Sequence, residues 1–141
     1  MSVTFQFDLV TPEKRLLTQD EMMLTVPGAE GYFGVLPGHA PMVSLLTMGV
    51  LTVGEGRGAV RYALSGGYAE VLPERTTILA DRVVCWDAID PVAVEAEKKE
   101  ALERGAEVRD DEAASRYWKK RQGFADLCLD VHKQYLSRST S

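Results

Sequence analysis

The chain has 141 residues, a formal net charge of −5 at pH 7, and 45% hydrophobic and 26% charged residues. This length suits one domain, or one domain with an appendage, and the acidic balance argues against a general nucleic-acid-binding protein, which would carry a basic face. No apolar run approaches the ~20 residues that cross a membrane as a helix, and no signal segment precedes the first strand pattern. We therefore expect a cytoplasmic protein that binds no nucleic acid and does not insert into the membrane.

Residues 1–87 alternate between apolar and polar side chains with the period of two that is typical of β-strands. The alternating positions are Val3, Phe5, Phe7 and Leu9, then Met22, Leu24 and Val26, then Val60, Tyr62 and Leu64, then Thr77, Leu79 and residues 83–85. Turn-forming residues separate these runs about every dozen positions. The pattern predicts an antiparallel sandwich or barrel, and the short connections leave no room for the helices that join parallel strands.

The segment from Gly31 to Pro41 holds three Gly and two Pro, together with the aromatic residues Tyr32 and Phe33. Glycine permits backbone angles that are closed to other residues, and proline fixes its own φ. We therefore predict a loop of fixed shape with exposed apolar side chains, and such loops serve recognition or catalysis. The alternative is a tight corner whose two aromatic side chains fold back into the core.

Two short motifs in this region invite a chemical interpretation. His39 has the titration range of a base or a metal ligand, but the other histidine, His132, lies on a distant predicted helix, and no further ligands or nucleophile turn accompany it. A structural or interface hydrogen bond is the preferred role for His39. Gly66–Gly67 lacks the further Gly and the Lys of a phosphate-binding loop, so a hairpin turn or a close backbone approach is expected there.

The composition of the chain changes near Asp87. Residues 1–87 contain ten of the 12 Gly, five of the 6 Pro and 16 charged residues, whereas the shorter span 88–141 contains 21 charged residues. Turn-rich sequence gives way to charged, Ala-rich sequence that favours helices. We place a domain boundary at this change. The two cysteines, Cys85 and Cys128, lie on dissimilar segments and are expected to be reduced, buried thiols.

Residues 88–141 predict two helices that form an antiparallel hairpin. The first starts at Asp90–Pro91, where Asp can cap the helix and Pro lacks only an N–H that no helix bond would use, and it stops near Gly105. The acidic pair Asp110–Asp111 indicates a second start. Apolar residues recur at helical spacing in the second helix, at Tyr117, Phe124, Cys128, Val131 and Tyr135. The first helix has only a thin apolar stripe, so the hairpin should be marginally stable alone.

Three strings in register resemble the epsilon subunit of the bacterial F-type ATP synthase. They are Gly34–Pro41 (GVLPGHAP), Leu64–Val71 (LSGGYAEV) and Thr77–Asp81 (TILAD). Their order and spacing match over residues 1–87, and the architecture continues the match over 88–141. The resemblance implies a ten-stranded antiparallel β-sandwich over 1–87 that docks on the stalk and the c-ring. An α-helical hairpin with a regulatory role follows over 88–141.

The resemblance also implies a function. Members of this family belong to the central stalk of a proton-translocating rotary ATP synthase, in which the sandwich couples the gamma subunit to the c-ring. The hairpin can extend toward the alpha/beta catalytic head and restrain ATP hydrolysis. The expected protein is therefore a non-catalytic subunit without a cofactor or metal, peripheral on the cytoplasmic face of the bacterial inner membrane.

Carried onto this chain, the resemblance implies two partner-binding surfaces. The first faces the c-ring and the stalk and consists of Gly31, Tyr32, Phe33, Gly34, His39 and Pro41. The second is the basic cluster Lys119, Lys120 and Arg121 on the second predicted helix, which would meet an acidic segment of the beta subunit. The alternative for this cluster is an ordinary solvated helix face.

Some family members bind ATP through a motif that reads Ile/Leu-Asp-x-x-Arg-Ala at the joint between the two domains. At this joint the chain reads Ile89-Asp90-Pro91-Val92-Ala93-Val94. Ala93 stands where the motif has arginine, and a methyl group cannot replace the bidentate phosphate contact of a guanidinium. ATP binding is therefore not expected, and Asp90 is interpreted as a helix cap. The alternative function is a small-molecule (nucleotide) sensor whose ligand lies between sandwich and hairpin.

Overall fold

The computed structural model describes residues 3–139, and the chain divides into two compact units, the first ending at Val83 and the second starting at Val84. Sequence composition placed the boundary later, at residue 87. Trp86 accounts for the difference, because its ring packs against Tyr135 with the centroids 5.2 Å apart. This contact attaches the segment before the first helix to the helical unit.

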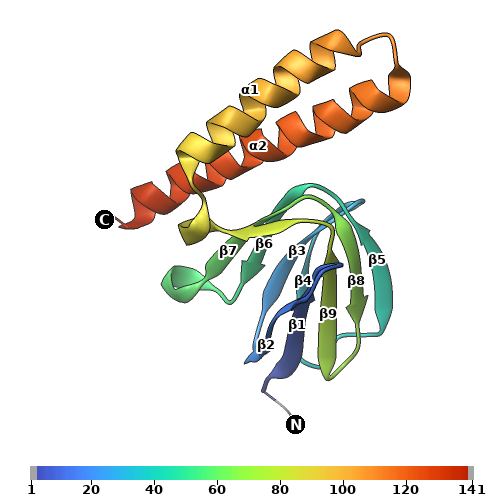
Figure 1. The fold of residues 1–141 in the computed structure, drawn as a ribbon. Helices are drawn as coiled ribbons and strands as arrows, with labels where there is room; N and C mark the ends of the chain where they lie inside the picture. Colours follow the sequence, from blue (N-terminus) through green and yellow to red (C-terminus); the bar gives the residue numbers. More distant parts are fainter. Residues whose placement is uncertain (1–2, 140–141) are drawn as a thin grey trace. The chain divides into compact units, whose positions relative to one another are not determined.

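Ten strands precede the helices, and a short 3-10 turn, η1 (Gly56–Gly58), interrupts them. The strands are β1 (Phe5–Val10), β2 (Arg15–Glu21), β3 (Leu24–Gly28), β4 (Gly31–Val35), β5 (Met42–Leu46), β6 (Gly49–Val53), β7 (Val60–Leu64), β8 (Gly67–Val71), β9 (Arg75–Ala80) and β10 (Val83–Cys85). They form one sheet in the order β10-β7-β6-β3-β5-β8-β9-β1-β2, with β4 attached to β3, and the sheet curls around a core (Figure 1). The predicted ten-stranded β-sandwich is confirmed.

One strand pair departs from the predicted antiparallel arrangement. β1 and β9 are parallel, with Phe7 opposite Thr76 and Leu9 opposite Ile78. The prediction from the sequence excluded parallel strands because the connections between consecutive strands are too short to hold a helix. Here the strands that lie between β1 and β9 along the chain supply the long connection, so no crossover helix is needed.

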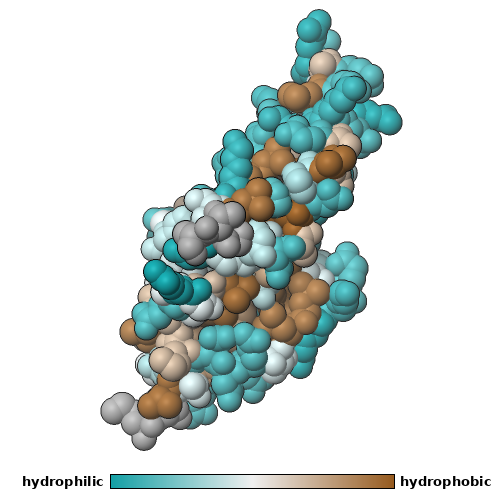
Figure 2. All heavy atoms as spheres, turned by 90° about the vertical axis from the view of Figure 1, so that its left-hand side faces the viewer, coloured by the Kyte–Doolittle hydropathy of each residue, from teal (hydrophilic) through white to brown (hydrophobic). Residues whose placement is uncertain are grey.

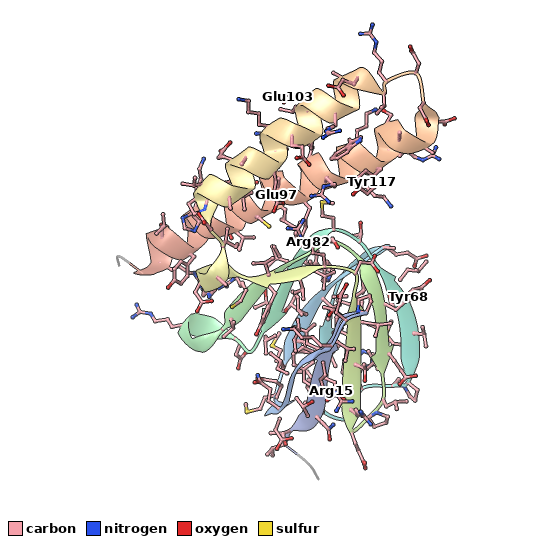
Figure 3. All side chains as sticks on the ribbon, in the orientation of Figure 1. Arg15, Tyr68, Arg82, Glu97, Glu103 and Tyr117 are labelled. Atoms are coloured by element: carbon pink, nitrogen blue, oxygen red, sulfur yellow. The ribbon has the colours of Figure 1, made fainter. Side chains whose placement is uncertain are left out.

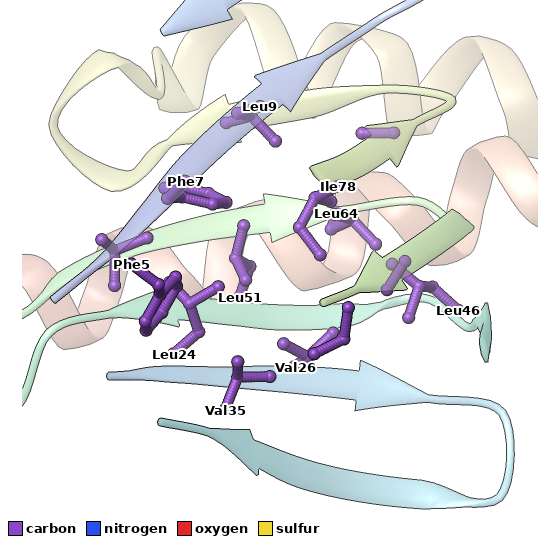
Figure 4. Packing of buried hydrophobic residues seen from close by; sticks show 14 residues of the cluster. Phe5, Phe7, Leu9, Leu24, Val26, Val35, Leu46, Leu51, Leu64 and Ile78 are labelled. Atoms are coloured by element: carbon purple, nitrogen blue, oxygen red, sulfur yellow. The ribbon is translucent and has the colours of Figure 1, made fainter. Parts of the chain in front are cut away.

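The core of the sandwich consists of apolar side chains that project inward from most strands (Figure 4). It comprises Phe5, Phe7, Leu9, Leu24, Val26, Val35, Leu46, Leu51, Val53, Leu64, Ala69, Val71, Ile78 and Ala80. The predicted alternation holds along β1 and β3, but Val3 and Met22, which lie outside the strands, are exposed. The prediction that Leu79 continues the pattern is wrong in phase, because Ile78 is buried opposite Ala69 and Leu79 faces outward.

The glycine pair between β7 and β8 permits a close approach of two backbones. Gly67 has φ +139, and a Cβ at this position would collide with the carbonyl oxygen of Leu79. Gly66 has φ +141, and its carbonyl oxygen accepts a hydrogen bond from the N–H of Asp81 at 3.0 Å. The close backbone approach predicted for this motif is confirmed.

An ion pair with one buried partner joins the two parallel strands. Arg75 of β9 places Nε 2.8 Å and Nη2 2.7 Å from Oδ2 of Asp8, whose side chain is 1% exposed. Burial alone would raise the pKa of Asp8, but hydrogen bonds from Thr18, Arg75 and Gln6 and the positive charge of Arg75 lower it below its usual value. The pair therefore favours the ionised carboxylate inside the first unit.

The second unit contains a 3-10 turn, η2 (Trp86–Ala88), and two helices, α1 (Pro91–Glu107) and α2 (Glu112–Ser139) (Figure 1). The carboxylate of Asp90 accepts hydrogen bonds from the N–H groups of Val92, at 3.1 Å, and Ala93, at 3.4 Å. Asp111 caps α2 in the same way, accepting from Ala114 N–H at 3.1 Å. The predicted helical hairpin and the cap at Asp90 are confirmed.

The two helices are joined along their length by specific contacts. Lys98 of α1 lies 2.9 Å from the carboxylate of Asp126 on α2. The predicted stop near Gly105 is two residues early, since α1 continues to Glu107. Gly105 instead marks a close approach, because a Cβ there would lie 3.4 Å from the Cβ of Trp118. Glycine at this position thus brings the helices together rather than ending one.

Both cysteines carry free thiols, as expected. Cys128 is buried, whereas Cys85 is only partly buried. Burial and a hydrogen bond with Asp87 raise the pKa of the Cys85 thiol to about 11. At neutral pH this thiol therefore stays protonated and is a poor nucleophile.

Candidate functional site

The segment predicted as a recognition loop is in part a strand. Residues 31–35 form β4, which pairs in register with β3 from Gly28↔Gly31 to Leu24↔Val35, and only residues 36–41 form a connecting turn. The prediction of a loop over the whole segment is wrong because Gly31, with φ +131, closes a two-residue hairpin turn rather than shaping a longer loop. The side chains of β4 are consequently held on a sheet.

The two aromatic residues of β4 lie on opposite faces. Tyr32 is 58% exposed, and its hydroxyl accepts a hydrogen bond from the N–H of Val50 at 2.9 Å. Phe33 is partly buried and packs against the core. Successive side chains on a strand point in opposite directions, so only Phe33 folds back toward the core as the second interpretation expects. Of the two, Tyr32 is the aromatic ring that is exposed and held in place.

The turn after β4 is ordered by backbone hydrogen bonds. The N–H of Gly38, which has φ +82, donates to the carbonyl oxygen of Pro73 at 2.8 Å. His39 places Nδ1 2.7 Å from the carbonyl oxygen of Ala40, where an Nδ1–H donates a hydrogen bond. His39 therefore has a local structural bond available, while Pro41 is exposed at the end of the turn.

A row of exposed apolar side chains crosses three neighbouring strands. Leu45 of β5 lies opposite Tyr68 of β8, and Tyr68 lies opposite Leu79 of β9. These side chains are 57%, 54% and 47% exposed, and Tyr68 projects away from the sheet (Figure 3). Contiguous exposed apolar surface typically marks an interaction site. Sequence reasoning missed this row because it depends on which strands are neighbours.

The basic cluster on α2 is not a uniform patch. Lys119 and Lys120 are exposed, but the guanidinium carbon of Arg121 lies 5.7 Å from the ring centroids of both Tyr117 and Trp118. Arg121 also donates a hydrogen bond from Nη1 to the hydroxyl of Tyr117 at 3.2 Å. The arrangement holds Arg121 against aromatic faces by cation–π attraction. The three predicted residues therefore do not act as equivalent free cations.

Polar side chains surround a depression between α1 and α2 within the helical unit. Its lining includes three carboxylates, Glu95, Asp126 and Asp130, and two lysines, Lys98 and Lys133. Lys98 is already paired with Asp126. Ala93 is exposed on the first turn of α1, and its side chain carries no charge. The lining thus holds three carboxylates against two lysines.

Within residues 3–139, no group of three or more His, Cys, Asp or Glu side chains is arranged to hold a metal ion. No helix in the same range is long and apolar enough to cross a membrane. On one face of the molecule, hydrophilic side chains dominate the surface of the helical unit (Figure 2). The candidate surfaces for binding a partner are therefore Tyr32 with β4, the row Leu45–Tyr68–Leu79, and the two exposed lysines of α2.

Comparisons with known proteins agree over both units. The family described as "ATP synthase, Delta/Epsilon chain, beta-sandwich domain" matches residues 4–85. A protein of Magnetococcus marinus named ATP synthase epsilon chain is 51% identical over 94 residues, which cover 67% of this chain and 69% of that protein. A protein of the same name from Mesorhizobium japonicum is 35% identical over 117 residues, covering 82% of this chain and 87% of the relative.

Two solved structures share the fold. One is a chain of the Euglena gracilis mitochondrial ATP synthase OSCP/F1/c-ring structure, with a TM-score of 0.75 and 23% identity over 93% of this chain and 82% of that chain. The other is a chain of the Tetrahymena thermophila mitochondrial ATP synthase central stalk/c-ring structure, with a TM-score of 0.56 and 16% identity over 91% of this chain and 96% of that chain. At these identities the likeness concerns the fold alone.

Proposed function

This chain belongs to the ATP synthase epsilon chain family, and on that premise we propose that it is a non-catalytic subunit of the central stalk of a bacterial rotary ATP synthase. In this role the sandwich couples the gamma subunit to the c-ring at the cytoplasmic face of the inner membrane. The observation that carries the proposal is the exposed, anchored ring of Tyr32 on a strand of the sandwich. The row Leu45–Tyr68–Leu79 supports it as a second apolar contact surface.

The direct test is recovery of the other subunits with this chain. The tagged full-length chain, expressed in its own bacterium, is purified from a mild detergent extract of the membranes. The proposal expects the alpha, beta and gamma subunits and the c-ring to be recovered together. Recovery of none of these subunits would overturn it. A tagged chain carrying Tyr68→Asn and Leu79→Asn serves as the comparison. This variant should recover smaller amounts of the other subunits if the apolar row contacts one of them.

We propose that the helical unit restrains ATP hydrolysis when it reaches the catalytic head. Lys119 and Lys120 are exposed and can meet an acidic surface, while Arg121 stays on the rings of Tyr117 and Trp118. The double variant Lys119→Glu with Lys120→Glu should raise the hydrolysis rate of the assembled complex severalfold, because like charges repel. Lys133→Glu, which reverses one charge elsewhere on the same helix, is the control. Equal rates in all three complexes would remove the lysines from this role.

We propose that the chain senses no nucleotide. Ala93 in place of the motif arginine and the carboxylates near Lys98 support this. A ligand that binds only the native state must raise the melting temperature. The melting temperature of the full chain should therefore not change with millimolar ATP, and Ala93→Arg should make it responsive. A saturable rise in the unaltered chain would instead favour the nucleotide-sensor function.

A further inference from the structure

The sheet has three free edges within the described residues, β2, β10 and β4, and these edges differ in how they are protected. Natural proteins protect sheet edges with charged residues, prolines, bulges or very short strands. β2 (RLLTQDE) carries Arg15, Asp20 and Glu21, and β10 has only three residues. β4 (GYFGV) has five residues, no charge and no proline, and it pairs with β3 in an unbroken register. β4 is therefore the one edge without such protection.

The register shows which backbone groups of β4 point outward. Pro27 has no N–H, and its carbonyl oxygen accepts a hydrogen bond from Thr47 N–H at 2.9 Å, so Pro27 makes no bond to Tyr32 opposite it. Hydrogen-bonded and non-bonded pairs alternate along an antiparallel ladder. The N–H and C=O groups of Tyr32 and Gly34 therefore point away from β3, while those of Phe33 point toward it. Two residues of β4 present the donor and acceptor pattern of an open strand.

Gly34 has no internal reason to be glycine. Its backbone does not adopt the left-handed conformation, and a Cβ at this position would meet nothing closer than the carbonyl oxygen of Leu24 at 3.9 Å. Glycine weakens a strand interior, and it is found where another backbone approaches closely. Within residues 3–139 nothing approaches Gly34 closely, so this position is open to the backbone of another chain. This observation is independent of the unprotected edge and points to the same surface.

The surroundings of β4 define the chemistry of the segment that would pair there. A depression of about 520 Å³ adjoins β4 and is lined by the turn at residues 28–30, the start of β4 and residues 42–45 of β5. Tyr32, Val43 and Leu45 give it an exposed apolar surface. Its charged lining residue is Glu30, and Glu70, opposite Val43, is exposed beside it. The complementary segment is extended and apolar, with a lysine or arginine at one end.

We propose that β4 accepts an extended segment of a partner subunit, apolar with a flanking basic residue, as an additional strand of the sheet. Main-chain hydrogen bonds to Tyr32 and Gly34 give such pairing its strength, and side chains over Tyr32 and Val43 give it selectivity. The inference rests on the proposed function, because it takes the partner to be a subunit of the same assembly. It adds the mode of recognition and the atoms that carry it.

Amide hydrogen exchange of the free chain and of the assembled complex tests the proposal without altering any residue. The amides of Phe33 and Val35 are bonded to β3 and should exchange slowly in both samples. The amides of Tyr32 and Gly34 should exchange fast in the free chain and at least about tenfold more slowly in the complex, because each gains a hydrogen bond. If the chain assembles while the amides of Tyr32 and Gly34 exchange as in the free chain, the proposal of an added strand is wrong and the proposed function stands. If the chain enters no complex, the proposed function fails first.

A pair of variants at one position tests the backbone contact directly. Gly34→Pro removes the outward N–H without removing a bond to β3, a placement that edge strands tolerate. Gly34→Ala adds a methyl group and keeps that N–H. The affinity of the Gly34→Pro chain for a complex that lacks this subunit should fall roughly tenfold or more, and that of the Gly34→Ala chain should fall less. Both variants should keep the melting temperature of the wild type. Equal affinities of both variants and the wild type would overturn the proposal. Protection of Tyr32 and Gly34 that grows with the concentration of the free chain would also overturn it, since the occupant would then be a second copy.

Discussion

The sandwich and the helical hairpin are held together in different ways. The sandwich encloses a cluster of 14 buried apolar residues contributed by strands that are distant along the chain (Figure 4). In the helical unit, by contrast, α1 buries Ala101 and α2 buries a short apolar row, and the Lys98–Asp126 ion pair adds a polar contact between them. The row consists of Phe124, Ala125, Cys128 and Val131. A large cooperative core makes a rigid platform, whereas a small apolar row makes an element that can open at a lower cost in free energy. The difference fits the docking role proposed for the sandwich and the regulatory role proposed for the helical unit.

Separating the two units should give the largest effect. A chain that ends at Cys85 keeps all ten strands and should retain a cooperative thermal transition, because its core is self-contained. Residues 86–141 alone should lose most of their helical circular dichroism, because a helix pair with only a small apolar core is marginal in water. A sandwich fragment without a cooperative transition, or a helical fragment with a sharp one, would contradict the view that the sandwich is the self-sufficient unit.

Gly67→Ala should be the most damaging single change in the sandwich. The left-handed φ and the collision with the Leu79 carbonyl oxygen leave no room for a Cβ, so we expect a loss of about 3 kcal/mol or more in the free energy of unfolding. Gly58→Ala is the control, since a Cβ there meets nothing within 4 Å and the backbone is not left-handed. Chemical denaturation of both variants decides the point. Similar stabilities would show that the strands β8 and β9 can separate at this position.

Arg75→Met should destabilise the sandwich by about 2 kcal/mol at pH 7, because it leaves the buried carboxylate of Asp8 without its partner. The pKa of Asp8 is lowered in the folded protein, so its stabilising contribution is present above the unfolded value of about 4 and is lost as the pH falls through the folded pKa. The difference between variant and wild type should therefore shrink below about pH 4. Arg57→Met, at an exposed turn, is the control. If the difference in the free energy of unfolding between Arg75→Met and the wild type does not depend on pH, Arg75 stabilises the sandwich by something other than the charge of Asp8.

The smallest effect should come from the cap of the hairpin. Asp90→Ala removes the acceptor of two helix N–H bonds and should cost about 1 kcal/mol, expressed as faster amide exchange in the first turn of α1. Asp110→Ala is the control, because Asp111 is the residue that caps α2. An Asp90 variant that exchanges like the wild type would mean that Pro91 alone sets the start of the helix.

The sequence could predict the elements that depend on local patterns. The alternation of Phe5, Phe7 and Leu9 indicated the buried face of β1, and Asp90–Pro91 indicated the start of α1, because both signals lie within a few residues. The pairing of β1 with β9 and the row Leu45–Tyr68–Leu79 could not be found in this way, because they arise from neighbours that only the folded sheet creates.

The candidate site shows the same limit at the level of single residues. Gly31 and Gly34 drew attention to this segment, but composition could not separate an exposed Tyr32 from a partly buried Phe33. That separation follows from the pairing of β4 with β3, which fixes the face of each side chain. Likewise, the run Lys119–Arg121 indicated charge, whereas the contact of Arg121 with Tyr117 depends on the helical spacing of four residues.

The central claim, that Tyr32 belongs to a docking surface on a rigid sandwich, is tested most directly by Tyr32→Ala, measured for both melting temperature and proton-coupled ATP synthesis. Tyr32→Phe, which keeps the ring and loses the bond to Val50, is the matched control. We expect Tyr32→Ala to melt close to the wild type while the rate of coupled ATP synthesis falls roughly tenfold or more, and we expect Tyr32→Phe to stay coupled. A collapsed melting temperature would make Tyr32 a structural residue, and unchanged melting with unchanged coupling would contradict the docking surface.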